Sequence, residues 1–315
     1  MNTKDNRRHR ADASTENQVV CFGEILWDML PEGRQLGGAP LNVCYHLRQQ
    51  GINSTIITQT GDDQPGRDIR KLLQQKGIDQ QYCLLSAHYP TSTVDVLVDA
   101  DQHISYTIRE QVAWDYIIVN ADLERCVAES SMLVFGSLIA RNPVSRNTLL
   151  KLIQKSAFRV FDINLRKPHY DREIIFELLQ KTNLLKLNGE ELSIITGWLP
   201  DRNLSENDPI QQLFETFPSV KEIIVTQGAA GAVYYSHHHT QKVQGVKVRV
   251  KDTVGSGDAF LAGFLTARIR GSALSEALEH AVLLSAFVAA HAGACPEYTE
   301  ADLKEFRKGV TGFPE

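Results

Sequence analysis

Short apolar runs alternate along the chain, from Gln18 onward, with segments in which apolar residues recur at helical spacing. Nearly continuous apolar runs of about four to eight residues are typical of strands buried on both faces of a sheet, and the intervening patterns predict helices that cover it. The predicted strands are residues 19–25, 54–60, 131–135, 158–163, 184–187 and 222–226. The predicted helices include residues 40–50, 66–76, 273–290 and 300–308. The pattern therefore predicts an α/β fold with a central, mainly parallel sheet flanked by helices.

Two segments depart from this alternation and have the pattern of antiparallel strand pairs. Residues 91–98 and 103–108 alternate apolar and polar positions around Asp99-Ala100-Asp101-Gln102, as a half-exposed hairpin does. Its valine face must cover something, and either a cleft or a second subunit could supply that surface. The residues Tyr234-Tyr235 and the stretch 242–250 predict a second antiparallel pair. We interpret the first hairpin as a small β lid over a cleft.

The organisation of the chain predicts one domain over residues 18–315, with the lid at about residues 91–110. Neither a sequence repeat nor a low-complexity linker divides it. Residues 1–17 form a polar stretch without the apolar run of a signal peptide, and its acidic residues argue against a transit peptide. We expect a disordered polar tail there.

Composition narrows the class of protein. Of 315 residues, 43% are hydrophobic and 23% are charged, and 38 acidic against 33 basic side chains leave a net charge of −5. Without a clustered basic excess, nucleic acid is not an expected partner. The longest apolar stretch, residues 281–294, is shorter than the ~20 residues of a membrane span, so no membrane association is expected. Five scattered cysteines predict reduced thiols in a cytoplasmic protein.

The strongest chemical signal is the stretch Asp252-Thr253-Val254-Gly255-Ser256-Gly257-Asp258-Ala259-Phe260. Glycines on both sides of Ser256 allow a tight turn, and an apolar helix that begins near Gly257 points its free N–H groups into the turn. Such a helix start favours a phosphate group, and Asp258 in the first turn could accept a proton from a nearby hydroxyl. The alternative is that Asp258 only caps the helix.

A second signal lies near the amino terminus. Asp28 follows the predicted strand 19–25, where α/β sheets place their ligands, and Gly37-Gly38 lets a ligand approach the backbone closely. The Asp28 carboxylate and the Asn42 amide would suit the vicinal hydroxyls of a sugar. The alternative is a turn with an exposed aspartate and an asparagine in a first helical turn.

Other known motifs do not fit. The chain lacks G-x-x-x-x-G-K-[ST], and the G-x-G that begins at Gly255 fails as a dinucleotide fingerprint at Phe260. A redox enzyme that uses a dinucleotide is therefore disfavoured. G-x-S-x-G, the usual signature of an α/β-hydrolase, is also missing. The run His237-His238-His239 falls at a predicted hairpin tip, where an exposed loop is favoured over a metal site.

The stretches GGAPLN and DTVGSGDAF closely resemble the two signatures of the ribokinase-like (PfkB) carbohydrate kinases, in the expected order. The resemblance extends from about Val19 to about Phe306, and the variants FGEILWDMLP, GGAPLN and FDINLR look most like bacterial fructokinases. It implies a ribokinase-like fold in which the predicted hairpin acts as the lid. It also implies an ATP- and Mg²⁺-dependent kinase that converts D-fructose to fructose 6-phosphate.

The resemblance implies roles for individual residues. Asp258 corresponds to the catalytic base, and the anion hole corresponds to Gly255, Ser256 and Gly257. The sugar-contacting positions correspond to Asp28, Gly38 and Asn42, and Arg166 is expected to reach the phosphates or the substrate. The alternative for Arg166 is an ordinary surface arginine.

The resemblance to the family also implies which residues bind the nucleotide and the metal ions. The resemblance implies nucleotide contacts at Lys186, Asn188, Thr226, Gly228, Gly231 and Ser285. Asn188 and Glu191 form an N-x-x-E pattern that would organise magnesium through water, although such a pair alone is usually a capping box. Backbone carbonyls near Asp252 and Val254 could hold a monovalent cation such as K⁺.

Two alternatives stay open beside fructose phosphorylation, one within the same class of function and one from a different class. The acceptor could be another small molecule, such as ribose, 2-keto-3-deoxygluconate or a nucleoside. The chain could also be a catalytically silent sugar sensor on the same fold, although the intact GSGD turn argues against this. The expected partners are a small sugar and ATP, with a homodimer through the lid as a further possibility.

Overall fold

The computed structural model describes residues 18–30, 33–98, 104–199 and 208–310. The predicted polar tail and the predicted lid turn at residues 99–102 lie outside the described residues.

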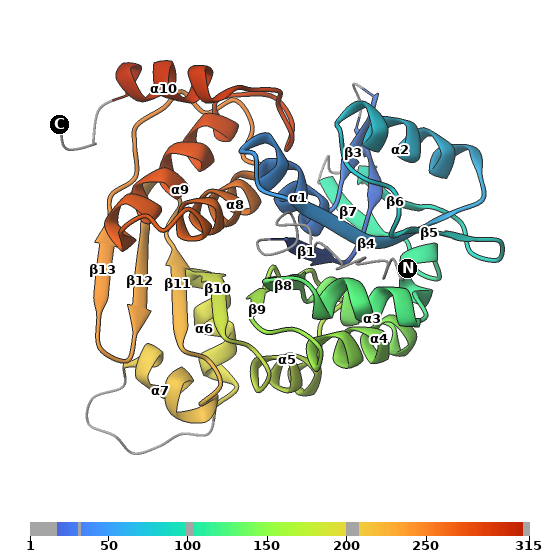
Figure 1. Cartoon of the computed structure of the whole chain (residues 1–315), viewed down its shortest axis with the longest axis horizontal. Helices are drawn as coiled ribbons and strands as arrows, with labels where there is room; N and C mark the ends of the chain where they lie inside the picture. Colours follow the sequence, from blue (N-terminus) through green and yellow to red (C-terminus); the bar gives the residue numbers. More distant parts are fainter. Residues whose placement is uncertain (1–17, 31–32, 99–103, 200–207, 311–315) are drawn as a thin grey trace, which may run out of the picture.

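A nine-stranded sheet, here called the large sheet, forms the centre of the molecule, with strand order β13-β12-β11-β10-β9-β8-β1-β4-β5 (Figure 1). Its strands are β1 (Val19–Phe22), β4 (Ser54–Gly61), β5 (Cys83–Ser86), β8 (Met132–Gly136), β9 (Arg159–Asp162), β10 (Leu184–Asn188), β11 (Glu222–Thr226), β12 (Ala232–Ser236) and β13 (Thr240–Val243). Neighbours pair in parallel from β5 to β11, and β12 and β13 are antiparallel. This confirms the predicted mainly parallel sheet.

Helices cover both faces of the large sheet (Figure 1). One layer contains α1 (Ala39–Gln49), α2 (Gln64–Gln75), α8 (Ser256–Ile269) and α9 (Leu274–Ala289), with α10 (Glu300–Gly309) against α9. The other layer contains α3 (Ala121–Ala128), α4 (Pro143–Ile153), α5 (Arg172–Leu179), α6 (Gly189–Gly197) and α7 (Pro209–Thr216). In β1, Val19 and Cys21 pack into the first layer, and Val20 and Phe22 pack into the second. The apolar run is continuous because successive strand residues face opposite layers.

A four-stranded sheet, here called the small sheet, has the order β3-β2-β6-β7. It contains β2 (Leu26–Leu30), β3 (Gly33–Gly37), β6 (Ser92–Val98) and β7 (Ile104–Ile108). The antiparallel pairing of β6 with β7 confirms the predicted hairpin. The start of β6 is anchored to the large sheet, because Thr91 Oγ1 donates to Asp63 Oδ1 at 2.6 Å and accepts from the Gly61 N–H at 3.0 Å.

The predicted strand 19–25 was wrong in extent, because β1 ends at Phe22 and the chain then enters the small sheet at Leu26. The break falls at Gly23, where a Cβ would lie 2.4 Å from Pro40 Cγ. Periodicity alone missed β2 and β3, since apolar residues run through the bend without interruption.

The predicted antiparallel stretch 242–250 was also wrong in extent, because β13 ends at Val243. Val243 pairs with Ala232, the first residue of β12, so among the described residues β12 offers no partner beyond it. At Gly245 the chain passes close to Ala229, whose carbonyl oxygen would lie 2.2 Å from a Cβ at that position. Residues 244–250 therefore leave the sheet.

Three short 3₁₀ helices complete the described elements: η1 (Ala113–Tyr116), η2 (Leu138–Ala140) and η3 (Gly228–Ala230). No helix among the described residues is both long and apolar enough to cross a membrane.

Candidate active site

A cavity of about 700 Å³ lies where the carboxyl ends of β9, β10 and β11 meet the start of α8 and the small sheet. The carboxyl edge of a parallel sheet is where α/β proteins bind ligands. Of the predicted site residues, those that line it are Asp28, Gly38, Asn42, Arg166, Lys186, Asn188, Glu191, Thr226, Asp252, Val254, Gly255, Gly257 and Asp258. The fold thus brings together two groups of residues from opposite halves of the sequence.

The start of α8 is shaped by its turn. Gly255 is the N-cap with φ +76°, and a Cβ there would lie 2.5 Å from Ala294 Cβ, so only glycine fits. Ser256 turns its hydroxyl back onto the Thr253 carbonyl at 2.8 Å and is not among the lining residues. The first N–H groups of a helix lack intrahelical partners, which suits the turn beside Gly257 to an anion, and its role as an anion hole stays a prediction.

Asp258 is the third residue of α8 and its side chain is buried. Its Oδ2 accepts a hydrogen bond from Asn42 Nδ2 at 2.8 Å, and no side chain caps the helix, so the alternative that Asp258 is only a cap is wrong. Burial, followed by the charge of Asp162, raises the pKa of Asp258 to about 7, although Lys186 and the Asn42 amide oppose the shift. A carboxyl with a pKa near neutrality is suited to exchange a proton with a substrate.

Lys186 and Asp162 form a buried ion pair beside Asp258. Lys186 Nζ lies 2.6 Å from Asp162 Oδ2, and each side chain is only 7% exposed. Burial alone would lower the pKa of Lys186, but the carboxylates of Asp162, Asp258 and Glu191 outweigh it and raise that pKa. Lys186 Nζ is also 3.4 Å from the position of a Cβ on Gly257, so its positive charge borders the anion-binding turn.

The sequence prediction did not single out Asp162, although it lies within the quoted FDINLR motif. Asp162 and Lys186 are partners in the parallel register of β9 and β10. The available signal was a charged residue in each of two buried strands, with Asp162 at the end of β9 and Lys186 within β10. It could be used only once the two strands were known to be neighbours.

Asn188 and Glu191 form a capping box at the start of α6. Asn188 Oδ1 accepts from the Glu191 N–H at 2.9 Å, and Glu191 Oε2 accepts from the Asn188 N–H at 2.8 Å. Glu191 Oε1 also accepts from the Leu165 N–H at 2.9 Å. The capping box expected of such a pair is therefore present, and both residues also line the cavity. With both oxygens engaged, the Glu191 carboxylate fits a magnesium ion bound through water, and that role stays a prediction.

Asp28 lies within β2 of the small sheet, so its predicted position just after the first strand was wrong. The alternative of an exposed turn is also wrong. Burial raises the pKa of Asp28 to about 6, while the nearby charge of Arg166 opposes the shift. A Cβ on Gly37 would lie 2.3 Å from Asp28 Oδ2, so this glycine leaves room for the carboxylate. Gly38 has φ +126°, and a Cβ on it would lie only 2.4 Å from the Glu24 carbonyl oxygen, so the chain passes close to Glu24 here.

Arg166 is exposed at the cavity rim, and its Nη1 donates to the Leu165 carbonyl at 3.2 Å. Its charge favours the ionised forms of Asp28 and Asp258 and so opposes the rise in their pKa values that burial causes. Arg166 is therefore both a surface residue and a cavity-lining residue, and its contact with phosphate or substrate stays a prediction.

Four predicted residues do not line the cavity: Ser256, Gly228, Gly231 and Ser285. Gly228 begins η3 after β11. Gly231 lies against β13, because a Cβ on Gly231 would be only 2.2 Å from the Val243 carbonyl oxygen. Ser285 is half-buried on α9. Thr226, at the end of β11, is the member of this nucleotide group that reaches the cavity.

Asp252 ties two loops together beside the cavity. Its Oδ1 accepts from the Val254 N–H and its Oδ2 from the Gly293 N–H, each at 3.0 Å. The predicted monovalent cation would lie near this loop pair.

The cavity also contains residues that sequence reasoning missed. Glu24 is buried after β1, and its Oε1 accepts from the Ala39 N–H at 3.1 Å, so it holds the loop before α1. Val94 and Ile108 are register partners on β6 and β7, and both are buried against the cavity. Part of the valine face of the hairpin therefore covers the cavity.

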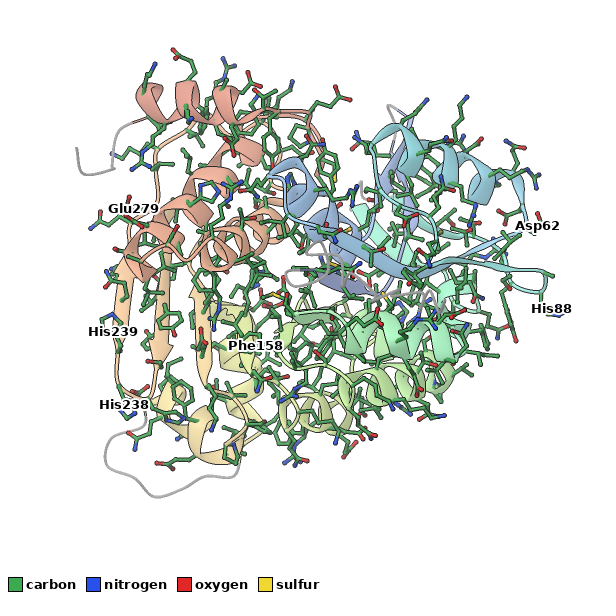
Figure 2. The ribbon with its side chains drawn as sticks, in the orientation of Figure 1. Asp62, His88, Phe158, His238, His239 and Glu279 are labelled. Carbon is green, nitrogen blue, oxygen red and sulfur yellow. The ribbon has the colours of Figure 1, made fainter. Side chains whose placement is uncertain are left out.

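The other singled-out residues lie away from the cavity. His237, His238 and His239 are exposed at the end of the β12–β13 hairpin, as predicted, and Figure 2 shows the labelled His238 and His239 at the outer edge of the molecule. The His237 ring packs against Phe214, with centroids 4.5 Å apart. All five cysteines are free thiols, and their reduced state in a cytoplasm stays a prediction.

A mainly parallel central sheet flanked by helices, with a small sheet at the same cavity, is the ribokinase-like α/β fold. The chain belongs to the pfkB family of carbohydrate kinases, because residues 19–301 match that family. It is a carbohydrate kinase, and the family uses ATP.

Individual relatives agree with this assignment. The fructokinase of Salmonella typhimurium is 31% identical over 272 residues, covering 79% of this chain and 83% of the relative. The ATP-dependent 6-phosphofructokinase of Thermoanaerobacterium thermosaccharolyticum is 28% identical over 307 residues, covering 90% and 91%. The crystal structure of fructokinase with bound ATP from Xylella fastidiosa has a similar fold, with a TM-score of 0.79, 20% identity, and coverage of 93% of this chain and 98% of that chain.

Proposed function

We propose that this carbohydrate kinase transfers the γ-phosphoryl group of ATP to D-fructose and forms fructose 6-phosphate. The observation that carries the proposal is the buried Asp258 carboxyl, hydrogen-bonded to Asn42 at 2.8 Å within a helix start suited to phosphate. The 31% identical relative from Salmonella typhimurium is a fructokinase, which supports fructose as the acceptor.

In this proposal Asp258 accepts the proton of the acceptor hydroxyl as the hydroxyl oxygen bonds to the γ-phosphorus of ATP. The bond from that phosphorus to the bridging oxygen breaks at the same time, and ADP leaves. The first-turn N–H groups near Gly257 and the Lys186 ammonium stabilise the negative charge on the transferred group. Ser256 supports this turn through its bond to the Thr253 carbonyl.

The acceptor would lie between the small sheet and α1. Asp28, Gly38 and Asn42 line that part of the cavity, and the Asp28 carboxylate would accept hydrogen bonds from sugar hydroxyls. Arg166 at the rim would contact phosphate oxygens, which a guanidinium binds well. Closure of the small sheet would keep water from accepting the phosphoryl group.

The nucleotide would extend from the α8 turn towards Asn188 and Thr226, with Gly228, Gly231 and Ser285 beyond the cavity. Magnesium would supply neutralisation of phosphate charge, and Glu191 would hold it through water. K⁺ would be held by backbone carbonyls near Asp252 and Val254, since the Asp252 carboxylate fixes the geometry of that loop.

A coupled assay of ADP release tests the acceptor. The panel contains D-fructose, ribose, 2-keto-3-deoxygluconate, a nucleoside and fructose 6-phosphate, the last because one relative is a 6-phosphofructokinase. We expect the highest kcat/KM with D-fructose. A higher value with another acceptor would replace the assigned sugar, and ADP release with none of them would support a catalytically silent sensor.

A further inference from the structure

The proposed base is connected to a cysteine outside the cavity lining. Asn42 donates from Nδ2 to Asp258 Oδ2 at 2.8 Å, and the Cys295 thiol donates to Asn42 Oδ1 at 3.3 Å. A side-chain amide has one donor end and one acceptor end. Because the thiol donor is on one side of Asn42, the acceptor end faces Cys295 and the donor end faces Asp258.

We propose that Cys295 is a positioning residue for the phosphoryl transfer: its S–H group fixes the orientation of the Asn42 amide and thereby holds Asp258 as a base. This inference rests on the proposed role of Asp258. Without the thiol, the Asn42 amide is free to rotate by half a turn and present its oxygen to the carboxylate. Two oxygens would then repel each other, and the charged form of Asp258 would lose its hydrogen bond.

The segment that carries Cys295 is held firmly against α1. Tyr45 Oη donates to the Pro296 carbonyl at 2.9 Å, and His46 Nε2 lies 2.8 Å from the Ala294 carbonyl oxygen. Tyr45 and His46 follow Asn42 by three and four residues, so all three lie on one face of the helix.

The buried His46 ring completes this attachment. Burial lowers the pKa of His46 to about 4, so the ring is neutral at physiological pH, and its Nε2–H donates to Ala294. Its Nδ1 then accepts from Tyr298 Oη at 3.1 Å. Lys76, the C-cap of α2, also donates from Nζ to the Cys295 carbonyl at 3.3 Å.

The same segment also packs against the turn at the start of α8, because a Cβ on Gly255 would lie 2.5 Å from Ala294 Cβ. The backbone around Cys295 is therefore fixed relative to both α1 and the start of α8. With both backbones fixed, the short thiol side chain has a defined distance to the Asn42 amide.

The thiol also keeps its proton. Burial raises the pKa of Cys295 to about 12, against the opposing charge of Lys76. The titratable groups that act on this thiol are Lys76, Asp258 and the Cys44 thiol. Cys295 consequently acts as a hydrogen-bond donor across the pH range in which Asp258 titrates.

The test compares Cys295→Ala, which removes the donor, with Cys295→Ser, which keeps one. We expect Cys295→Ala to move the acid limb of the kcat/KM profile upward by about half to one pH unit, so that activity at pH 6.5 falls about threefold to tenfold. Activity at pH 9 and the KM for ATP should change little. Cys295→Ser should restore most of the wild-type profile. Cys295→Val is a second variant without a donor, in case Cys295→Ala does not fold.

Cys126→Ala is the matched control, because Cys126 is a buried thiol that packs in the opposite layer of the molecule. It should leave the pH profile unchanged. Adding Cys295→Ala to an Asn42→Ala variant should cause no further shift of the limb, since the amide that the thiol orients is already gone.

The outcomes separate this inference from the proposed function. If Asp258→Asn abolishes turnover while Cys295→Ala leaves the acid limb in place, the positioning role is wrong and the base assignment stands. Equal shifts in Cys295→Ser and Cys295→Ala would likewise overturn the donor argument. If Asp258→Asn retains near wild-type turnover, the base assignment itself fails.

Discussion

The two ends of the cavity hold their carboxyl groups in different ways. At the phosphate end, Asp258 is buried in the first turn of α8, accepts a hydrogen bond from Asn42 and is influenced by the charges of Asp162 and Lys186. At the acceptor end, Asp28 is on a strand of the small sheet, and no hydrogen bond reaches its carboxylate within the part of the chain that the structure describes.

This difference indicates how the site divides the work. A proton acceptor must keep one geometry through the reaction, so its partners are built into the protein. A substrate ligand must keep its hydrogen-bonding capacity for the substrate, so its oxygens stay open. Desolvation raises the pKa of both groups, to about 7 for Asp258 and about 6 for Asp28, but only Asp258 has its orientation fixed by the protein.

The largest expected effect is at the phosphate end. Asp258→Asn should lower kcat by about 10²-fold or more, because the general base is lost while the side chain keeps its shape. Steady-state kinetics with D-fructose would measure the loss, and ATP binding measured by calorimetry should be nearly unchanged. A variant with wild-type kcat would remove the distinction between the two carboxyl groups.

A smaller and more selective effect is expected at the acceptor end. Asp28→Ala should lower kcat/KM for D-fructose by about tenfold to a few hundredfold, because losing a hydrogen bond to a charged acceptor costs about 1.5–3 kcal/mol. The KM for ATP should move far less, since the nucleotide residues lie beyond Leu184. Equal damage to both substrates would contradict the division into two ends.

The pH dependence of activity should reflect the raised pKa of Asp258. Because only the ionised carboxylate can accept a proton, kcat/KM should fall tenfold per pH unit below about pH 7. A profile of the wild-type enzyme between pH 5 and pH 9 measures this limb. A limb near pH 4 would indicate a base outside this buried environment.

The ionisation of Asp258 that raises activity should lower the stability of the folded protein. A carboxyl whose folded pKa of about 7 exceeds its unfolded value of about 3.9 stabilises the protein while protonated, and this contribution is lost as the pH rises through 7. The Tm of Asp258→Asn minus the Tm of wild type should therefore increase between pH 5 and pH 8, because the variant carries no buried charge at this position. Unfolding scans of both proteins at the two pH values test this, and a gain that is the same at both would contradict it.

The smallest effect concerns the predicted lid. Val94 and Ile108 of the small sheet are buried against the cavity, so substrate binding should slow amide exchange in β6 and β7. Hydrogen exchange with and without D-fructose and a non-hydrolysable ATP analogue measures the change. Protection that is already high without ligand and weakens on dilution would favour a dimer through the lid, and fast exchange in every condition would remove the lid role.

Much of the large sheet and of the phosphate turn could be predicted from local sequence. The strands near residues 131–135 and 222–226 lie within a residue or two of their predicted bounds, because a strand buried on both faces requires a continuous apolar run. The turn around Gly255 was predictable because its glycines and the following apolar helix are consecutive in the chain.

The sequence by itself therefore determined which residue types stand at the strand ends and where the helix behind Asp258 begins. Only the tertiary structure decided that β2 and β3 leave the large sheet, that Lys186 pairs with Asp162, and that Cys295 reaches Asn42. Asn42 and Asp258 are 216 residues apart, and their hydrogen bond exists because α1 and α8 pack in the same layer. Local patterning specifies which face of an element is buried, but the partner on that face is chosen by the packing of the whole chain.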